Sequence, residues 1–297
     1  MPVPLLNRIR PRNIAVFRAL QLGDMLCTVP ALRALRRQCP DAGITLVSLP
    51  WAASLAARFP HLIDDFIAFP GFPGLPERRP NLAAIPAFIA DTQARGFDLA
   101  VQMHGSGWLT NRIVALFGAG AQAGFGDEFD SRCALPFPES GSEVHRLLTL
   151  MAHLGAASGD RTLEFPLLPG DHAELADSAA GRALRGQPYV CIHAGARDPA
   201  RRWPADCFAR VADALHALTG WTPVLTGSGD ERPLTAQVKQ MMSTPAIDAA
   251  APISAGALAA LIAGSRLLVC NDTGVSHIAA ALRVPSVVVF RGSDPGR

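Results

Sequence analysis

The segment Leu267–Ala281 has a polar turn directly after an apolar stretch, with Asp272 and Thr273 followed by Gly274. This order predicts a strand, a turn and a helix. The first backbone N–H groups of a helix have no partner within it, and the helix dipole places partial positive charge there, so a phosphate group binds well at such a turn. His277 lies one helical turn further along the same face. Alternatively, Asp272 or Thr273 only caps the helix and His277 is an ordinary surface or core histidine.

A second candidate phosphate site follows the apolar stretch Tyr189–Ile192. The chain continues there with His193-Ala194-Gly195-Ala196 and then with Arg201-Arg202-Trp203-Pro204. Small residues let the backbone approach a ligand closely, and arginines supply charge that can neutralise a diphosphate. Pro204 suits the first position of a new helix. The alternative is a basic loop that only contacts solvent.

Two acidic side chains also stand where they could do chemistry. Asp24 begins the helix expected after the strand Asn13–Phe17, and a carboxylate there could accept the proton of an incoming hydroxyl group. Glu231 follows the strand expected at Pro223–Thr226, where an acidic residue could accept hydrogen bonds from ribose hydroxyls. Helix capping is the alternative at both places, by Asp24 itself and by Asp230 beside Glu231.

The elements that must position these residues follow from the hydrophobic pattern. Apolar, β-rich runs alternate with amphipathic runs rich in alanine and leucine, which indicates βαβ units and a parallel sheet. In the first half, the expected strands are Asn13–Phe17, Ile44–Leu49, Asp65–Phe69, Asp98–Gln102 and Gln122–Phe125. The expected helices are Asp24–Gln38, Trp51–Arg58, Leu82–Arg95, Leu109–Phe117 and Glu143–Leu154.

Between Gly155 and Gly170 the pattern loses its period and becomes rich in Gly, Ser and Pro. This change predicts two domains, residues 1–165 and 166–297. In the second half, the expected strands are Tyr189–His193, Pro223–Thr226, Leu267–Cys270 and Ser286–Phe290, and the expected helices are Asp171–Leu184, Pro204–Leu218, Glu231–Met241, Ser254–Ala263 and Gly274–Leu282. We therefore expect an α/β fold of two Rossmann-like domains, with ligands bound in a cleft beyond the carboxyl ends of the strands.

Composition and missing motifs exclude several classes of protein. The 297 residues are 49% hydrophobic and 18% charged with a net charge of +2, which argues against a disordered chain and against a protein that mainly binds nucleic acid. No Gly-x-Gly-x-x-Gly follows the first strand, which disfavours a nicotinamide dehydrogenase, and no Gly-x-Ser-x-Gly or Walker loop occurs. No Asp-x-Asp triplet is present to hold a divalent metal, so arginines and helix N-termini are expected to neutralise a diphosphate.

The six cysteines are scattered without the spacing of metal ligands, which favours a reduced, cytoplasmic protein. No apolar run near the N-terminus is long enough for a signal peptide or a membrane span. The segment Pro2–Leu6 and the residues Arg8, Arg10 and Arg12 favour a frayed basic tail. A peripheral contact with an anionic membrane surface is the alternative.

Three motifs in a fixed order resemble those of glycosyltransferase family 9, the group that includes the ADP-heptose:lipopolysaccharide heptosyltransferases. They are Leu22–Leu32, His193–Ala196 with Arg201–Pro204, and Asp272–His277 with Ala279–Ala281. The resemblance spans nearly the whole chain, and three linked motifs are more specific than any one of them.

The resemblance implies the GT-B architecture, with an acceptor-binding domain at residues 1–165 and a donor-binding domain at residues 166–297. It also implies inverting sugar transfer without a metal or other cofactor, with Asp24 as the general base. Arg201, where the family usually has Lys, would lie beside the donor phosphates, and Thr273 and Gly274 would offer backbone N–H groups to the diphosphate. The other donor-binding residues implied are His193, Gly195, Arg202, Glu231, Asp272 and His277.

The resulting hypothesis is a glycosyltransferase that moves heptose from ADP-heptose to a lipopolysaccharide-core or related lipid-linked saccharide. Such an enzyme would be cytoplasmic, with a peripheral contact to the inner membrane as an option, and the long surface loop expected at Gly71–Pro80 could fold over the acceptor. The chain ends at Arg297, whereas family members usually continue, so it is either truncated or a short variant. The alternatives are a non-catalytic protein that binds nucleotide sugars and another sugar-nucleotide enzyme, such as an epimerase.

Overall fold

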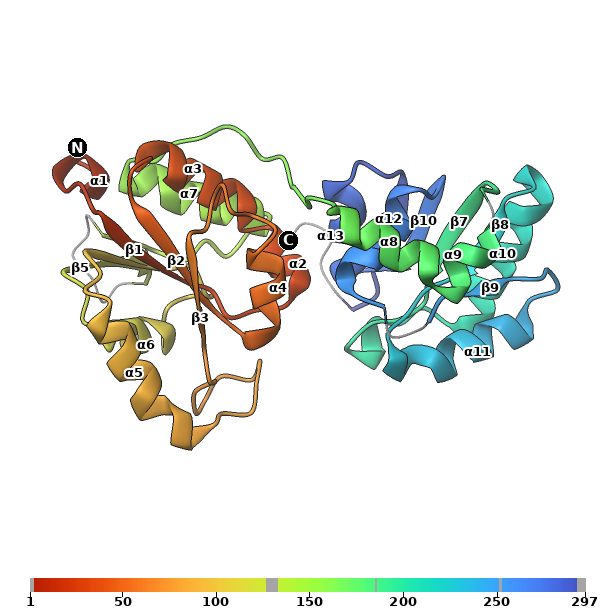
Figure 1. Ribbon diagram of the computed structural model, residues 1–297, viewed down its shortest axis with the longest axis horizontal. Helices are drawn as coiled ribbons and strands as arrows, with labels where there is room; N and C mark the ends of the chain where they lie inside the picture. Colours follow the sequence, from red (N-terminus) through yellow and green to blue (C-terminus); the bar gives the residue numbers. More distant parts are fainter. Residues whose placement is uncertain (1–2, 127–132, 185, 251–252, 293–297) are drawn as a thin grey trace. The chain divides into compact units, whose positions relative to one another are not determined.

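The computed structural model describes residues 3–126, 133–184, 186–250 and 253–292. The chain divides into two compact units, unit 1 up to Thr162 and unit 2 from Leu163 onward. Each unit is a parallel β-sheet with helices (Figure 1). The expectation of two α/β domains with parallel sheets is confirmed.

Unit 1 contains a six-stranded sheet in the order β3-β2-β1-β4-β5-β6, in which every neighbouring pair is parallel. The strands are β1 (Asn13–Phe17), β2 (Gly43–Ser48), β3 (Asp65–Ala68), β4 (Leu99–Gln102), β5 (Ala121–Phe125) and β6 (Ala134–Leu135). The helices are α1 (Leu5–Arg8), α2 (Leu22–Leu26), α3 (Val29–Gln38), α4 (Ala53–Ala56), α5 (Ile85–Ala94), α6 (Thr110–Ala115) and α7 (Glu143–Leu154), with short 3₁₀ turns at Pro50–Ala52 and Leu82–Ala84.

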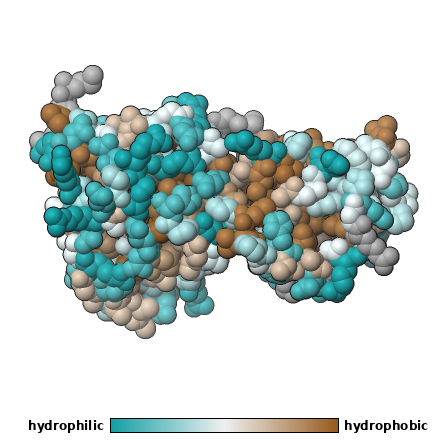
Figure 2. Space-filling view, turned by 45° about the horizontal axis from the view of Figure 1, so that its top comes forward, coloured by the Kyte–Doolittle hydropathy of each residue, from teal (hydrophilic) through white to brown (hydrophobic). Residues whose placement is uncertain are grey.

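Most residues of these strands are apolar, because helices cover both faces of the sheet. On one face, Phe17 of β1 packs edge-to-face against Phe69 and Phe117, in a core that α5 and α6 complete. Helices α3 and α7 lie side by side on the other face (Figure 1). In the view of Figure 2, hydrophilic side chains dominate the surface of this unit.

The single helix expected at Asp24–Gln38 was wrong, because the chain forms α2 and α3 with a break at Cys27 and Thr28. The hydroxyl of Thr28 donates to the main-chain carbonyl of Asp24 at 2.9 Å. Pro30 then lies in the first turn of α3, where its missing N–H costs nothing. The break makes α2 a short helix directly beyond β1.

The frayed tail expected at the N-terminus was also wrong where the structure describes it. Residues Leu5–Arg8 form α1, and the side chains of Leu5 and Leu6 are buried. Pro2 lies outside the described residues. The apolar side chains of this segment therefore pack against the protein.

Unit 2 contains a five-stranded parallel sheet in the order β11-β10-β7-β8-β9. The strands are β7 (Tyr189–His193), β8 (Thr222–Leu225), β9 (Ile247–Asp248), β10 (Leu267–Asn271) and β11 (Ser286–Val289). The helices are α8 (Pro169–Asp177), α9 (Ala179–Leu184), α10 (Ala205–Thr219), α11 (Arg232–Met241), α12 (Ala255–Ala263) and α13 (Gly274–Ala281), with 3₁₀ turns at Pro199–Arg201 and Gly229–Glu231.

The helix expected at Asp171–Leu184 is two helices, α8 and α9, which meet at Ser178. Its hydroxyl donates to the carbonyl of Leu175 at 2.6 Å and accepts from the N–H of Gly181 at 3.0 Å. Gly181 is needed there because a Cβ would overlap the Leu175 carbonyl. In the described part of the chain, no helix has both the length and the apolar composition to cross a membrane.

Candidate active site

Asp24 lies in the first turn of α2, directly beyond the carboxyl end of β1. The capping interpretation for Asp24 was wrong, because Gln21 occupies the N-cap position of this helix. The main-chain carbonyl of Asp24 accepts two hydrogen bonds, but no described residue donates a hydrogen bond to the Asp24 carboxylate. A carboxylate in this state can accept a proton from a substrate hydroxyl.

Arg18 fixes the main chain beside Asp24. This arginine is fully buried and follows β1 directly, and its Nε donates to the Asp24 carbonyl at 3.1 Å. Its two other nitrogens donate to the carbonyl of Met103 and to Glu143 Oε1, the latter at 3.0 Å. Glu143 in turn pairs with Arg146 at 3.1 Å. Sequence analysis gave Arg18 no role, although a charged residue immediately after an apolar strand was the available signal.

His104 and Glu77 form a second pair at the same edge of the sheet. The Ala19 N–H donates to His104 Nδ1 at 3.1 Å, which leaves Nε2 to carry the ring proton and donate to Glu77 Oε1 at 3.3 Å. Burial lowers the pKa of His104, and the nearby Glu77 carboxylate offsets this only in part, so the ring is held neutral. The pair anchors the loop Gly71–Pro80, which sequence analysis had treated as a surface loop. Neither residue was predicted.

In unit 2, Asp272 and Arg201 come together at the start of α13. Arg201 Nη1 lies 3.4 Å from Asp272 Oδ2. Thr273 occupies the N-cap position, but its side chain makes no capping hydrogen bond, so the capping alternative for Asp272 and Thr273 was wrong. The N-terminal N–H groups of α13, beginning with Gly274, therefore have no side-chain cap. His277 is half-buried one turn further along this helix.

His193, Gly195 and Glu231 form a second cluster in unit 2. His193 Nδ1 lies 3.0 Å from Thr226 Oγ1, and its Nε2 lies 4.0 Å from Glu231 Oε2. Burial lowers the pKa of His193, and the Glu231 carboxylate partly offsets this effect. A Cβ at Gly195 would overlap the same carboxylate, so any larger residue there would displace the Glu231 side chain.

Glu231, and not Asp230, caps the turn after β8. The Ser228 N–H donates to Glu231 Oε2 at 2.9 Å. This bond occupies one carboxylate oxygen and holds the other beside Gly195. The alternative that Asp230 caps this turn was therefore wrong, and the role of Glu231 toward ribose stays a prediction.

Two further side chains hold the loops of unit 2 in place. Arg202 Nε donates to the Ala196 carbonyl at 2.9 Å, so this arginine braces its loop. Asn271, which was not predicted, is fully buried at the end of β10. Its oxygen accepts from the Trp203 N–H at 2.9 Å, and its nitrogen donates to the Ala194 carbonyl at 2.8 Å. Asn271 thus joins the two phosphate-site loops that sequence analysis treated separately.

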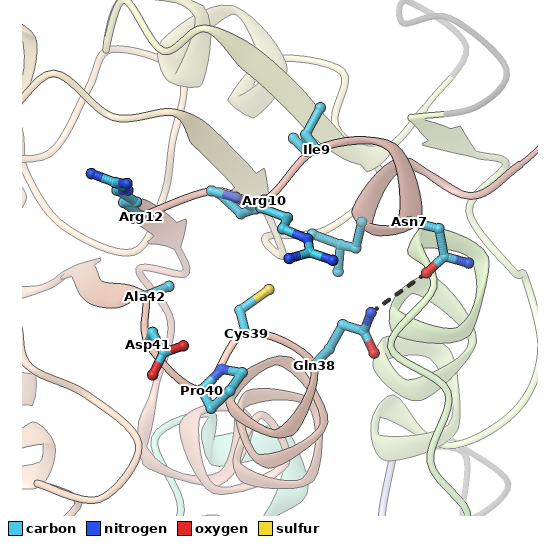
Figure 3. Close-up of a pocket in the computed structure, with 11 residues that line it drawn as sticks. Asn7, Ile9, Arg10, Arg12, Gln38, Cys39, Pro40, Asp41 and Ala42 are labelled. Carbon is cyan, nitrogen blue, oxygen red and sulfur yellow. Dashed lines mark hydrogen bonds between the residues drawn. The ribbon is translucent and has the colours of Figure 1, made fainter.

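The predicted donor-binding residues all lie in unit 2, whereas Asp24 lies in unit 1. Within the described part of the chain, no three His, Cys, Asp or Glu side chains gather closely enough to hold a metal ion. A cavity at the opposite end of the unit 1 sheet, beside the start of β1, contains none of the predicted site residues (Figure 3). Arg10, Cys39 and Asp41 are among its lining residues, and Gln38 donates to Asn7 across it at 3.5 Å.

Comparison with known proteins decides the family. Residues 87–297 match the family described as glycosyltransferase family 9 (heptosyltransferase). The chain belongs to glycosyltransferase family 9. It is therefore a glycosyltransferase, and the family resemblance carried by the three motifs is confirmed.

Relatives of this family 9 chain extend the likeness over its whole length. Lipopolysaccharide heptosyltransferase 3 of Escherichia coli is 26% identical over 290 residues, which cover 92% of this chain and 81% of the relative. A glycosyltransferase family 9 structure from Veillonella parvula superposes with a TM-score of 0.83 at 22% identity, covering 96% of this chain and 82% of that one. The structure of E. coli ADP-heptose lps heptosyltransferase II superposes with a TM-score of 0.75 at 20% identity, covering 96% of this chain and 86% of that one. The GT-B fold class is thus confirmed.

Proposed function

We propose that this protein transfers heptose from ADP-heptose to a lipopolysaccharide-core saccharide. The names of the relatives support this choice of donor and acceptor. We assign acceptor binding to unit 1 and donor binding to unit 2, because the uncapped start of α13 and Arg201 suit a diphosphate. The observation that carries the proposal is the Asp24 carboxylate, which has no hydrogen-bond donor among the described residues and whose main chain the buried Arg18 holds.

In the proposed mechanism, Asp24 accepts the proton of the attacking acceptor hydroxyl. The hydroxyl oxygen forms a bond to the anomeric carbon of heptose while the bond from that carbon to the diphosphate breaks, which inverts the anomeric configuration. The N–H groups at the start of α13 and the Arg201 guanidinium balance the charge of the departing ADP. Thr273 and Gly274 supply those N–H groups, and no metal ion is assigned a role.

The remaining donor contacts follow from the two clusters of unit 2. Asp272 and His277 line the sugar and phosphate end, and Glu231 accepts hydrogen bonds from the ribose through the oxygen that does not cap the turn. His193 and Gly195 shape the pocket beside Glu231, and Arg202 holds its loop. No other cofactor enters the proposal.

We also propose that a membrane contact, where it exists, is electrostatic and lies on the cytoplasmic face of the inner membrane. Arg10 and Arg12 are exposed beside α1, whereas the neighbouring Leu5 and Leu6 are buried and cannot enter a bilayer. Co-sedimentation with vesicles of anionic lipid should then be lost in high salt. Binding that resists salt would contradict this part of the proposal.

The experiment that tests the function combines binding and turnover. Calorimetric titration with ADP, UDP and GDP should show the tightest binding for ADP, and incubation with ADP-heptose and a truncated lipopolysaccharide core should extend the core by one heptose. NMR of the product should show an anomeric configuration opposite to that of the donor. Tight donor binding without transfer to any core would identify a non-catalytic binding protein instead, and a changed sugar nucleotide without acceptor would identify an epimerase.

A further inference from the structure

A highly exposed tryptophan stands at the same sheet edge as Asp24. Trp108 is 73% exposed and lies on the loop that leads from β4 to α6. Strand β4 pairs directly with β1, and the helix that follows β1, α2, carries Asp24. Because both strands are parallel, their carboxyl-end loops are neighbours. An aromatic ring is therefore displayed to solvent at the sheet edge that also carries the candidate general base.

The loop that carries Trp108 is held firmly. Buried Gln102 and Thr110 both donate to the His104 carbonyl, at 2.6 and 3.0 Å. Gly107 adopts a positive φ of 90°, and a Cβ there would overlap the Phe125 carbonyl and the side chain of Asn111. The exposure of Trp108 thus results from a fixed loop conformation, although an exposed tryptophan side chain loses the free energy of burial.

On the loop that meets the loop of Trp108, one carboxylate oxygen has no partner among the described residues. Glu77 Oε1 accepts from His104, but Oε2 is buried and no described residue donates to it. The loop of Glu77 meets the loop of Trp108, since a Cβ on Gly74 would lie 3.0 Å from Leu109 Cδ2. A buried oxygen without a donor is costly, and a ligand hydroxyl removes that cost. Because Oε2 itself is buried, a ligand hydroxyl reaches it only if the Glu77 side chain, which is 16% exposed, shifts further toward the surface.

An exposed aromatic face and an unsatisfied carboxylate oxygen on two adjoining loops match the chemistry of a saccharide. The C–H face of a sugar ring packs on an aromatic ring, while its hydroxyls donate to carboxylates. A nucleobase also stacks on tryptophan, but the proposed function places the nucleotide in unit 2. The charges of Glu77 and Asp24 both act on the ring of His104, which puts the two carboxylates in one neighbourhood.

We propose that Trp108 and the Glu77–His104 pair form the subsite that binds the acceptor saccharide. One sugar ring packs on Trp108 and donates a hydroxyl hydrogen bond to Glu77 Oε2, beside the hydroxyl that Asp24 deprotonates. His104 acts as a positioning residue, because its Nε2–H holds Glu77 in place. This subsite rests on the proposed function.

The first test replaces Trp108, which is too exposed to be needed for folding. Trp108→Ala should raise the KM for a deacylated core oligosaccharide on the order of tenfold, the effect typical of one aromatic stacking contact. The affinity for ADP should not change. Leu218→Ala is the matched control, since Leu218 is 82% exposed on α10 of unit 2. An unchanged KM in Trp108→Ala would overturn the proposal.

The second test separates ligand binding from loop anchoring. In Glu77→Gln the amide oxygen still accepts from His104, so the loop stays anchored, but an N–H₂ group replaces Oε2. The KM for the oligosaccharide should rise about tenfold or more, since hydrogen bonds to charged groups have this strength. If Glu77 only anchors the loop, Glu77→Gln should behave as the wild type, which would contradict the role of Oε2.

Direct calorimetry of the same oligosaccharide distinguishes failure of the subsite from failure of the proposed function. A wild type that transfers no heptose but binds the oligosaccharide more tightly than Trp108→Ala would refute the function and keep the subsite. Equal binding by both proteins would refute the subsite, whatever the transfer assay shows.

Discussion

The guanidinium of Arg18 donates from Nε to the main-chain carbonyl of Asp24 at 3.1 Å, from a position that is fully buried. The same group also bonds to Met103 and Glu143, so three segments of unit 1 meet at this side chain. Because the bond is made to the main chain, the carboxylate of Asp24 stays available. A buried cation thus fixes the loop of the candidate base without neutralising it by direct contact.

Replacing Asp24 by Asn should abolish most sugar transfer. The amide cannot accept the proton of the acceptor hydroxyl, so kcat should fall about 10²- to 10⁴-fold, the usual contribution of a general base. The Kd for ADP, measured by calorimetry, should not change. Asp41→Asn is the control, because Asp41 is an exposed carboxylate of unit 1 in the turn before β2. Full turnover by folded Asp24→Asn would remove Asp24 from the mechanism.

Replacing Arg18 by Met should destabilise unit 1. The change removes the donor to the buried Met103 carbonyl and leaves Arg146 as the remaining partner of Glu143. We expect a loss of about 1–3 kcal/mol, the cost of leaving a buried polar group unsatisfied. Urea denaturation followed by tryptophan fluorescence measures the loss. Arg210→Met, which removes an exposed arginine, should leave the unfolding curve unchanged. An Arg18→Met variant as stable as the wild type would show that the network is not stabilising.

Replacing Gly195 by Ala should weaken donor binding. The added methyl group overlaps the Glu231 carboxylate and forces it away from Ser228 and His193. We expect the Kd for ADP to rise roughly tenfold, the loss of about one hydrogen bond to a charged group. In Gly229→Ala the methyl group meets no atom within 4 Å, so this variant of the turn that carries Glu231 should bind ADP normally. Equal affinities would argue against Glu231 as the ribose contact.

The stability of the protein should fall in mildly acidic solution. Burial lowers the pKa of His104 and of His193 below their ordinary value of 6.5, so the unfolded chain binds protons at a higher pH than the folded one. The contribution of neutral histidines is therefore complete above about pH 6.5 and is lost as the pH falls from there toward the folded pKa values. Urea midpoints at about pH 7.5 and 5.5 measure the change. His104→Gln should show a smaller decrease, and identical wild-type midpoints would contradict the prediction.

Local patterns predicted much of the fold. Strands β1 and β7 and helix α7 have the bounds expected from the sequence, because their apolar periodicity and turn residues are properties of the contiguous chain. The errors occurred where one side chain bonds to nearby backbone. Thr28 separates α2 from α3 and Ser178 separates α8 from α9, although helical periodicity continues through both breaks.

Local pattern also missed the short strands β6 and β9, of two residues each, which exist only because a longer strand lies beside them. The positions that could contact a nucleotide sugar were visible as polar residues after apolar strands, and their family motifs determined the class of enzyme. Their partners were not visible.

The sequence by itself determined the alternation of strands and helices, the family and the places where a base and a phosphate site could lie. Tertiary structure alone decided that Arg18, which holds the main chain of Asp24, also bonds to Glu143, 125 residues away, and that Asn271 joins the loop at Ala194, 77 residues away. The hydrophobic periodicity of a sequence indicates which face of an element a side chain lies on. It does not indicate which residue from a distant segment that side chain contacts. Such contacts depend on the order of strands in the sheet, because that order brings the carboxyl-end loops of separate segments together.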